Sequence, residues 1–398
     1  MPKDSPQPRS TRPKRACTAV SKVVSESSSS DASTFDPLGS QPNSRKASSA
    51  TTPKRRKSTR GSAGLTGLAQ LLVDGKQVLF VTGAGLSVAS GVRPFRSTTA
   101  GSSKITVPSK RGVQPTAGLW NSVIWTTATR EAFLKDPVAW YNDFWRPYFA
   151  DGKTYHPNAA HLALQALHEK YDVRQVTQNI DGLQQPSHDL IEAHGRVGLY
   201  KCIGSLEDNQ GEDEDEDDEE SSEENEDRPV HLGHRTISSE LRKKAEDPET
   251  CPYQYLISVP PDQLEPEIRD ILAFNPPKKK LKTAPRCPCC EGLLLPQALL
   301  FDEGYHDHNF YDFERIEAWL ESSDALVFVG TSFAAVRLTT ICLQFARETR
   351  LPVYNFNLHD TLQSTTYLNV TNIVGPCDET LPSLVAACDD LQPSEEID

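Results

Sequence analysis

Short runs of apolar residues alternate with amphipathic segments from about residue 64 onward. Helices are predicted where apolar residues recur at helical spacing: after Leu65, and at 137–148, 157–170 with Pro157 in the first turn, 312–321 and 336–348. Strands are predicted at 77–82, 172–177, 295–301, 325–329, 353–356 and 372–374. This alternation predicts an α/β fold with a doubly wound parallel sheet.

Polar motifs follow four of the predicted strands. Gly83, Gln178, Gly330 and Asn357 each come directly after an apolar run. The carboxyl ends of parallel strands meet at one edge of a sheet, and ligands bind there in open α/β folds. We therefore expect these four positions to belong to one site.

Charge divides the chain into blocks. Residues 1–62 hold 13 Lys and Arg against 4 acids and are rich in Ser, Thr and Pro, and Glu207–Asp227 holds 15 acids and no base. Such segments bury too little apolar surface to offset chain entropy, so we expect disorder at 1–62, at about 205–248 and at 391–398. Either charged block is solvated by default, and the acidic one could also contact a basic histone tail.

A basic cluster at Pro53–Lys57 (PKRRK) resembles a nuclear import address, and the alternative is a solvated, non-specific patch. Nuclear localisation is therefore expected, with the cytoplasm left open. Direct binding of nucleic acid is not indicated beyond the basic tail. Nine cysteines without an apolar leader after Met1 indicate a reducing compartment, and the longest apolar stretches are too short for a membrane span.

The loop after the first strand carries Gly83 and Gly85, which allow a tight turn and let backbone N–H groups approach a pyrophosphate at a helix start. The third glycine of the dinucleotide fingerprint would fall at Val88, and no acidic ribose ligand follows about 20 residues later. The loop predicts dinucleotide binding but disfavours an ordinary dehydrogenase.

Several motifs in order resemble the sirtuin family of NAD-dependent protein deacylases. They are GAGLSVASGV at 83–92, FRS at 95–97, TQNID at 177–181, EAHG at 192–195, CPCCEGL at 287–293, GTS at 330–332, FN at 356–357 and GPCDE at 375–379. The resemblance covers roughly residues 64–384 and implies a Rossmann-like fold with a small zinc-binding module inserted. It implies a catalytic domain at 63–390, with the module at 200–292 containing the acidic insertion.

The same resemblance assigns the residues that hold NAD. The phosphate and nicotinamide side is implied to comprise Gly83, Ala84, Gly85, Ser87, Phe95 and Arg96, and the TQNID motif is implied to add Gln178, Asn179, Ile180 and Asp181 as cofactor-binding residues. The adenosine side is implied to comprise Gly330, Thr331, Ser332, Asn357 and Cys377.

The implied chemistry suits these residue types. Cleavage of the nicotinamide–ribose bond creates positive character on the ribose carbon, so an amide such as Asn179 and a carboxylate such as Asp181 can grip the carboxamide and stabilise charge. His194 suits the general base, because an ordinary histidine takes a hydroxyl proton near neutral pH. The alternative for His194 is a structural histidine.

The acylated lysine of a sirtuin substrate pairs with an extended segment, and the similar segment here is Leu299–Gly304. Leu299, Phe301, Asp302 and Glu303 are the expected substrate-binding residues, with a plain core strand as the alternative. One departure lies upstream, where Pro94 stands in place of the carboxylate that many sirtuins carry beside the nicotinamide. The departure bears on the rate and the acyl preference that the resemblance implies.

The zinc module is the second departure. Cys287 and Cys290 have the two-residue gap of a tetrahedral zinc site, but the expected first pair is reduced to Cys202, with Ser205 at the fourth position. We expect Cys251 to complete a structural zinc site with Cys202, Cys287 and Cys290, with Cys289 as a competing ligand and a metal-free module as the alternative.

Together these features predict an NAD-dependent protein-lysine deacetylase (deacylase) that releases nicotinamide and O-acyl-ADP-ribose. Its expected substrates are acylated lysines of nuclear proteins, including histones. Two alternatives stay open. One is protein mono-ADP-ribosylation at the same site, which also begins with loss of nicotinamide. The other is a chromatin-binding module that senses NAD without turning it over.

Overall fold

The computed structural model describes residues 59–92, 126–149, 153–204, 250–274, 279–333 and 336–392. The basic cluster at 53–57, the acidic run at 207–227 and the end of the chain after residue 392 lie outside the described residues. Within the described part, no helix is long and apolar enough to cross a bilayer.

Six parallel strands form the main sheet. They are β1 (Val78–Thr82), β2 (Val173–Thr177), β3 (Leu190–Glu192), β6 (Ala325–Val329), β7 (Val353–Asn357) and β8 (Val370–Val374), and they lie in the order β3-β2-β1-β6-β7-β8. The chain builds outward from β1 in one direction and then returns to build outward from β6 in the other. This order confirms the predicted doubly wound, Rossmann-like sheet and puts its switch point between β1 and β6.

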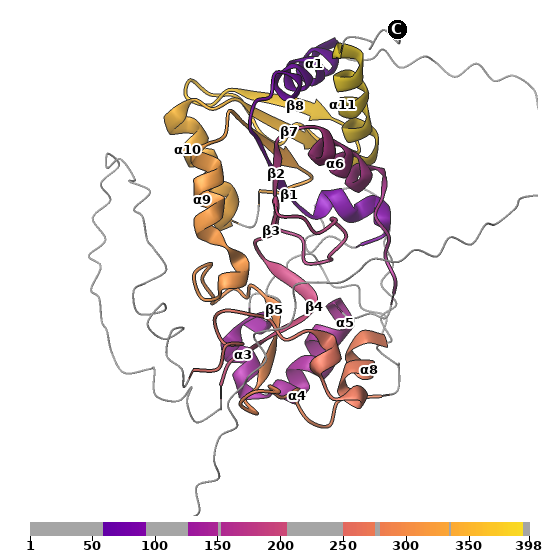
Figure 1. Cartoon of the computed structure of the whole chain (residues 1–398), viewed down its shortest axis with the longest axis vertical. Coiled ribbons are helices and arrows are strands. Elements are labelled where there is room, and N and C mark those ends of the chain that lie inside the picture. The colour runs from indigo at the N-terminus through magenta and orange to yellow at the C-terminus, as the bar shows by residue number, and fades with distance from the viewer. Residues whose placement is uncertain are drawn as a thin grey trace, which may run out of the picture. The chain divides into compact units, whose positions relative to one another are not determined.

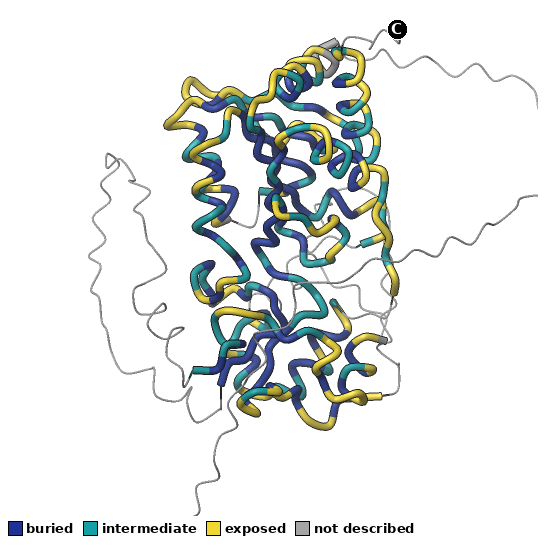
Figure 2. The backbone as a smooth tube through the Cα atoms, viewed as in Figure 1, coloured by how far each residue is buried: buried dark blue, intermediate teal, exposed yellow. Residues whose placement is uncertain are grey.

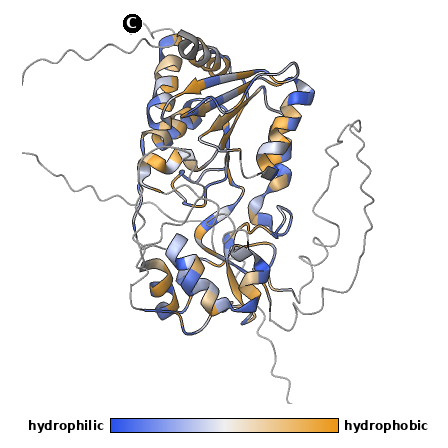
Figure 3. Ribbon diagram, turned by 180° about the vertical axis from the view of Figure 1, so that it is seen from behind, coloured by the Kyte–Doolittle hydropathy of each residue, from blue (hydrophilic) through white to orange (hydrophobic). Residues whose placement is uncertain are grey.

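Helices cover both faces of this sheet (Figure 1). One face carries α1 (Thr59–Val73), α6 (Ala159–Lys170) and α11 (Cys377–Leu391), and the other carries α9 (Phe313–Glu321) and α10 (Val336–Thr349). Val78 and Phe80 of β1 pack toward the first group, whereas Leu79 and Val81 pack toward the second. Because both faces are covered, the central strands β1 and β6 are buried throughout and almost wholly apolar, whereas the edge strand β8 buries only Ile373; Figures 2 and 3 show the buried, apolar centre of the sheet.

A smaller module has its own core. It contains α3 (Arg130–Lys135), α4 (Pro137–Ala139), a π-helical segment η2 (Trp140–Trp145), α5 (Arg146–Phe149), η3 (Pro261–Gln263) and α8 (Pro266–Phe274). These elements pack around β4 (Gly195–Cys202) and β5 (Leu294–Ala298), which pair antiparallel in a separate two-stranded sheet.

The prediction that 295–301 belongs to the parallel sheet was therefore wrong. This segment contributes β5, which pairs antiparallel with β4. The chain enters the cysteine module along β4 and leaves it along β5, and Cys202 at the end of β4 pairs with Leu294 at the start of β5. The parallel edge strand is instead β3, whose three residues are too few to show an alternating pattern.

Helix boundaries also differ from the prediction in places. The helix expected at 157–170 begins at Ala159, because Asn158 caps it by accepting a hydrogen bond from the Ala160 N–H at 2.8 Å. The segment 137–148 is interrupted by the π-helical turn, and α8 lies in a stretch where no helix was predicted. Helix α1 begins at Thr59, four residues before the domain boundary expected from composition.

Candidate functional site

Two glycine turns meet at the switch point of the sheet. Gly83 ends β1 and caps the 3₁₀ helix η1 (Ala84–Ser90), and Gly330 ends β6 with a φ of 61°. The Gly85 N–H donates to the Gly330 carbonyl at 2.8 Å, and a Cβ on Gly85 would lie 2.6 Å from the Gly330 Cα. Only glycine permits this approach, so a dinucleotide at the crevice would meet bare backbone at the start of η1.

A chain of buried polar side chains lies directly behind the first turn. Asn179 Nδ2 donates to the Gly83 carbonyl at 3.0 Å and to Ser87 Oγ at 3.3 Å, and Ser87 Oγ lies 3.4 Å from His161 Nε2. His161 Nδ1 accepts the Asn158 N–H at 3.2 Å, so Nε2 carries the ring proton. Burial lowers the pKa of His161 and keeps it neutral.

Sequence reasoning missed His161. Its signal is the spacing of three residues from the capping residue Asn158, which is the spacing of a capping box. The structure adds that the same side chain reaches the glycine loop through Ser87.

The residues expected on the adenosine side also lie together. Gln178 Nε2 lies 3.4 Å from Thr331 Oγ1, and Asn357 Nδ2 donates to the Thr331 carbonyl at 2.8 Å. Cys377, at the start of α11, places its Sγ 4.0 Å from the Phe356 carbonyl. These contacts join the carboxyl ends of β2, β6 and β7, as the sequence predicted. Ser332 is exposed beside them.

His194 lies in the turn between β3 and β4, half-buried. Its Nδ1 is 3.1 Å from the Gln178 carbonyl and its Nε2 is 2.9 Å from the Tyr305 hydroxyl. Because a carbonyl only accepts, Nδ1 carries the proton, and Nε2 is the unprotonated nitrogen whose lone pair faces the Tyr305 hydroxyl. Burial lowers the pKa of His194 to about 4, with the Gln178 carbonyl acting in the opposite direction. The ring is thus an unprotonated base at neutral pH.

The remaining residues of the predicted nicotinamide side are placed as follows. Asp181 is half-buried and its Oδ1 accepts the Leu183 N–H at 3.0 Å, while Ile180 packs against the core of the smaller module. Ala84 is half-buried in η1. Phe95 and Arg96 lie outside the described residues.

The segment expected to bind substrate follows β5. Leu299 is half-buried and its N–H donates to the His194 carbonyl at 2.9 Å, and Phe301 is 40% exposed. The Asp302 carboxylate instead accepts the N–H groups of Arg130 and Glu131 at 2.7 and 3.0 Å, at the start of α3.

Glu303 is buried and forms an ion pair with Lys201 at 2.6 Å. The carboxylates of Asp302 and Glu303 therefore bind this chain's own groups, which the sequence pattern did not reveal. Of the predicted set, Leu299 and Phe301 carry the apolar side chains, and Leu299 is joined to His194 through its backbone N–H.

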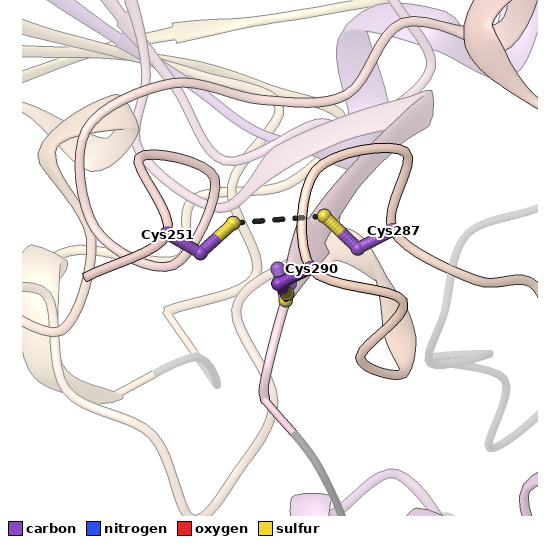
Figure 4. A group of neighbouring side chains, drawn as sticks. Cys251, Cys287 and Cys290 are labelled. Carbon is purple, nitrogen blue, oxygen red and sulfur yellow. Dashed lines mark hydrogen bonds between the residues drawn. The ribbon is translucent and has the colours of Figure 1, made fainter. Parts of the chain in front are cut away.

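Four cysteines meet in the smaller module, and Figure 4 labels three of them, Cys251, Cys287 and Cys290. The Sγ atoms of Cys202, Cys251, Cys287 and Cys290 all lie within 4.8 Å of one another, with Cys202 to Cys290 at 3.4 Å and Cys251 to Cys287 at 3.6 Å. Zinc–thiolate bonds of about 2.3 Å place tetrahedral sulfurs about 3.8 Å apart, so the cluster fits one zinc ion. Cys251 stands beside Cys202 although 48 residues separate them in the sequence.

Comparison with known proteins agrees with this arrangement. The Sir2 family model matches residues 83–337. The chain is 29% identical to the NAD-dependent deacetylase sir2E of Dictyostelium discoideum over 327 residues, covering 80% of this chain and 75% of that protein. It is 26% identical to the mitochondrial NAD-dependent protein deacylase sirtuin-5 of Xenopus tropicalis, covering 82% and 87% of the two chains.

A solved structure concerned with the mechanism and regulation of Sir2 enzymes matches the fold with a TM-score of 0.53, at 20% identity, over 83% of this chain and 100% of that one. The family match includes the glycine turn, the Asn179 segment, His194 and the cysteine cluster. The chain therefore belongs to the Sir2 family.

Proposed function

We propose that this chain is an NAD-dependent protein-lysine deacylase in which His194 is the general base and the acylated lysines belong to nuclear proteins, including histones. The observation that carries the proposal is the tautomer of His194. With Nδ1–H held by the Gln178 carbonyl, Nε2 is unprotonated, so its lone pair can take a proton from a ribose hydroxyl. In the full reaction the acyl oxygen first bonds to the ribose carbon as nicotinamide leaves, which forms an imidate. The deprotonated hydroxyl oxygen then attacks the acyl carbon of that imidate, and water releases free lysine and O-acyl-ADP-ribose.

The groups around His194 support distinct roles in this reaction. Asn179 is held by Gly83 and Ser87, so its amide is fixed where the glycine turn would receive the cofactor phosphates. Asp181 follows two residues later and supplies negative charge for the developing positive ribose. NAD supplies the leaving nicotinamide and the ribose that accepts the acyl group.

Leu299 and Phe301 support an apolar path for the acylated lysine. Acylation removes the lysine charge, so the side chain gains from contact with apolar walls. Leu299 is tied to His194 through its backbone N–H, which brings this wall within reach of the base. The clustered cysteines support a structural zinc ion that holds together the ends of β4 and β5.

Nicotinamide release from NAD, with and without an acetylated peptide, tests the activity. We expect release that depends on the peptide, and we expect His194→Ala to lower turnover by about 10²- to 10⁴-fold while NAD binding by calorimetry is retained. His188→Ala, on an exposed loop histidine, is the matched control. Labelling of protein from NAD without peptide would indicate ADP-ribosylation instead, and binding of NAD without release would indicate an NAD-sensing module.

Nuclear targeting rests on the basic cluster at 53–57. Replacement of Lys54, Arg55 and Arg56 by alanine in a fluorescently tagged full-length chain is expected to shift it from nucleus to cytoplasm. Unchanged nuclear accumulation would contradict the assignment of this cluster. Deacylation of histone H3 and H4 tail peptides, compared with peptides of equal length from cytoplasmic proteins, tests the substrate class.

A further inference from the structure

We propose that Tyr305 is a positioning residue for His194, an inference that rests on the proposed role of His194 as base. In the substrate-free chain, the Tyr305 hydroxyl proton occupies the lone pair of His194 Nε2 and fixes the ring in the tautomer with the proton on Nδ1. A hydroxyl of the bound ribose must then take the place of the tyrosine hydroxyl.

The direction of the hydrogen bonds carries the first step. The Gln178 carbonyl can only accept, so it takes the Nδ1 proton and leaves Nε2 as an acceptor. The partner of Nε2 at 2.9 Å is the Tyr305 hydroxyl, which must therefore be the donor. Tyr305 also accepts a backbone hydrogen bond from Leu338 in the first turn of α10. The hydroxyl thus has one acceptor and one donor role, and both are used.

Packing holds the tyrosine in this position. Tyr305 is 6% exposed, and its ring stacks on Phe313 of α9 with centroids 4.7 Å apart. The Leu338 N–H is one of the donors that a helix start leaves without an intrahelical partner, so Tyr305 also satisfies α10. The ring is therefore anchored to two helices that cover the sheet, and it transmits their position to His194.

Among the residues that the structure describes, the hydrogen-bond partner of Nε2 is the Tyr305 hydroxyl. Burial raises the pKa of the Tyr305 hydroxyl, which keeps its proton in place at neutral pH. Of the neighbouring groups on α10, Cys342 also raises this pKa and Arg337 lowers it. On the strand side of His194, Glu192 is paired with Arg196 at 2.7 Å. His306 follows Tyr305 in the chain, and its ring packs edge-on against Phe313.

Competition for one lone pair gives the consequence. An in-plane imidazole nitrogen accepts one good hydrogen bond, so Tyr305 and the ribose hydroxyl cannot both donate to Nε2. A donor that binds only the neutral ring also stabilises it against protonation. Removal of the tyrosine hydroxyl should therefore raise the pKa of His194.

Titration of the full chain labelled with ¹⁵N-histidine measures this directly by NMR. We expect the wild-type His194 to show a protonated Nδ1 and an unprotonated Nε2. In Tyr305→Phe we expect its pKa to rise by roughly half a unit to one unit, the equivalent of one ordinary hydrogen bond. The acidic limb of the pH–rate profile should move upward by the same amount.

Tyr311→Phe is the matched control, because Tyr311 is another buried tyrosine of the same segment, with its hydroxyl on Lys201 at 2.8 Å. It should lower stability without moving the pKa of His194. A proton found on Nε2, or equal pKa values in wild type and Tyr305→Phe, would overturn the proposal. The NMR titration needs no turnover, so it tests the contact between Tyr305 and His194 separately from catalysis. If His194→Ala keeps its turnover while Tyr305→Phe still raises the pKa of His194, then His194 is not the base but its contact with Tyr305 is confirmed.

Discussion

Replacing Glu303 by glutamine separates a structural role from a role in substrate binding. The side chains of Glu303 and Lys201 are each 4% exposed. The three donors of the Lys201 ammonium are met by Glu303, by the Tyr311 hydroxyl at 2.8 Å and by the Ala298 carbonyl at 3.2 Å. Glutamine keeps the shape and one acceptor but removes the charge that balances the buried ammonium.

The magnitude follows from that imbalance. Breaking a buried ion pair by removing one partner costs about 3–5 kcal/mol, which is a large share of the roughly 5–15 kcal/mol that stabilises an ordinary domain. Because glutamine keeps one hydrogen-bond acceptor for Lys201, the loss of stability in Glu303→Gln should lie near the lower end of this 3–5 kcal/mol range, at about 3 kcal/mol. At about 2–4 °C per kcal/mol for chains of this class, the melting temperature should fall by about 6–12 °C.

Thermal and urea unfolding of the full chain measure the loss, and deacylation kinetics at a temperature where both proteins are folded measure KM for the acylated peptide. Glu131→Gln is the matched control, because Glu131 pairs with Lys135 on the surface and its loss should change stability by less than about 0.5 kcal/mol. The double variant Lys201→Met with Glu303→Gln should regain part of the stability. A tenfold rise in KM with unchanged stability would refute the structural role and restore the substrate-binding expectation.

Three further outcomes are expected. The purified chain should hold about one zinc ion per molecule. Cys251→Ser should lose the ion and unfold at a lower temperature, whereas Cys289→Ser should keep it. Metal analysis of both variants checks this, and loss of zinc from Cys289→Ser but not from Cys251→Ser would make Cys289 the ligand. Gly85→Ala should weaken NAD binding and lower the free energy of unfolding by about 1–3 kcal/mol, because its Cβ meets the Gly330 backbone. The control Gly67→Ala in α1 meets only a hydroxyl at 3.6 Å and should leave stability unchanged or raise it. Calorimetry with NAD and urea unfolding measure the two effects. Because the base acts unprotonated and burial lowers the pKa of His194 to about 4, turnover should fall only well below pH ~6.5, and half-maximal turnover near that ordinary histidine value would contradict the burial argument.

The order of apolar and polar residues in the sequence was sufficient to predict features that depend only on neighbouring residues. Strands buried on both faces read as continuous apolar runs, so five of the six parallel strands were visible in the sequence, four of them with a polar end such as Gly83 after Val78–Thr82. The glycines of the phosphate turn and the paired Cys287 and Cys290 were likewise visible, because their spacing is itself the chemical requirement.

Tertiary structure decided what depends on residues far apart in the chain. The sequence predicts Asp302 and Glu303 as substrate contacts. In the structure the Asp302 carboxylate accepts N–H groups at the start of α3, and the buried Glu303 carboxylate pairs with Lys201. The hydroxyl of Tyr305 meets the ring of His194 across 111 positions of sequence. No periodicity encodes such a meeting, because it depends on how the segment after β5 packs between two helices and the end of the sheet.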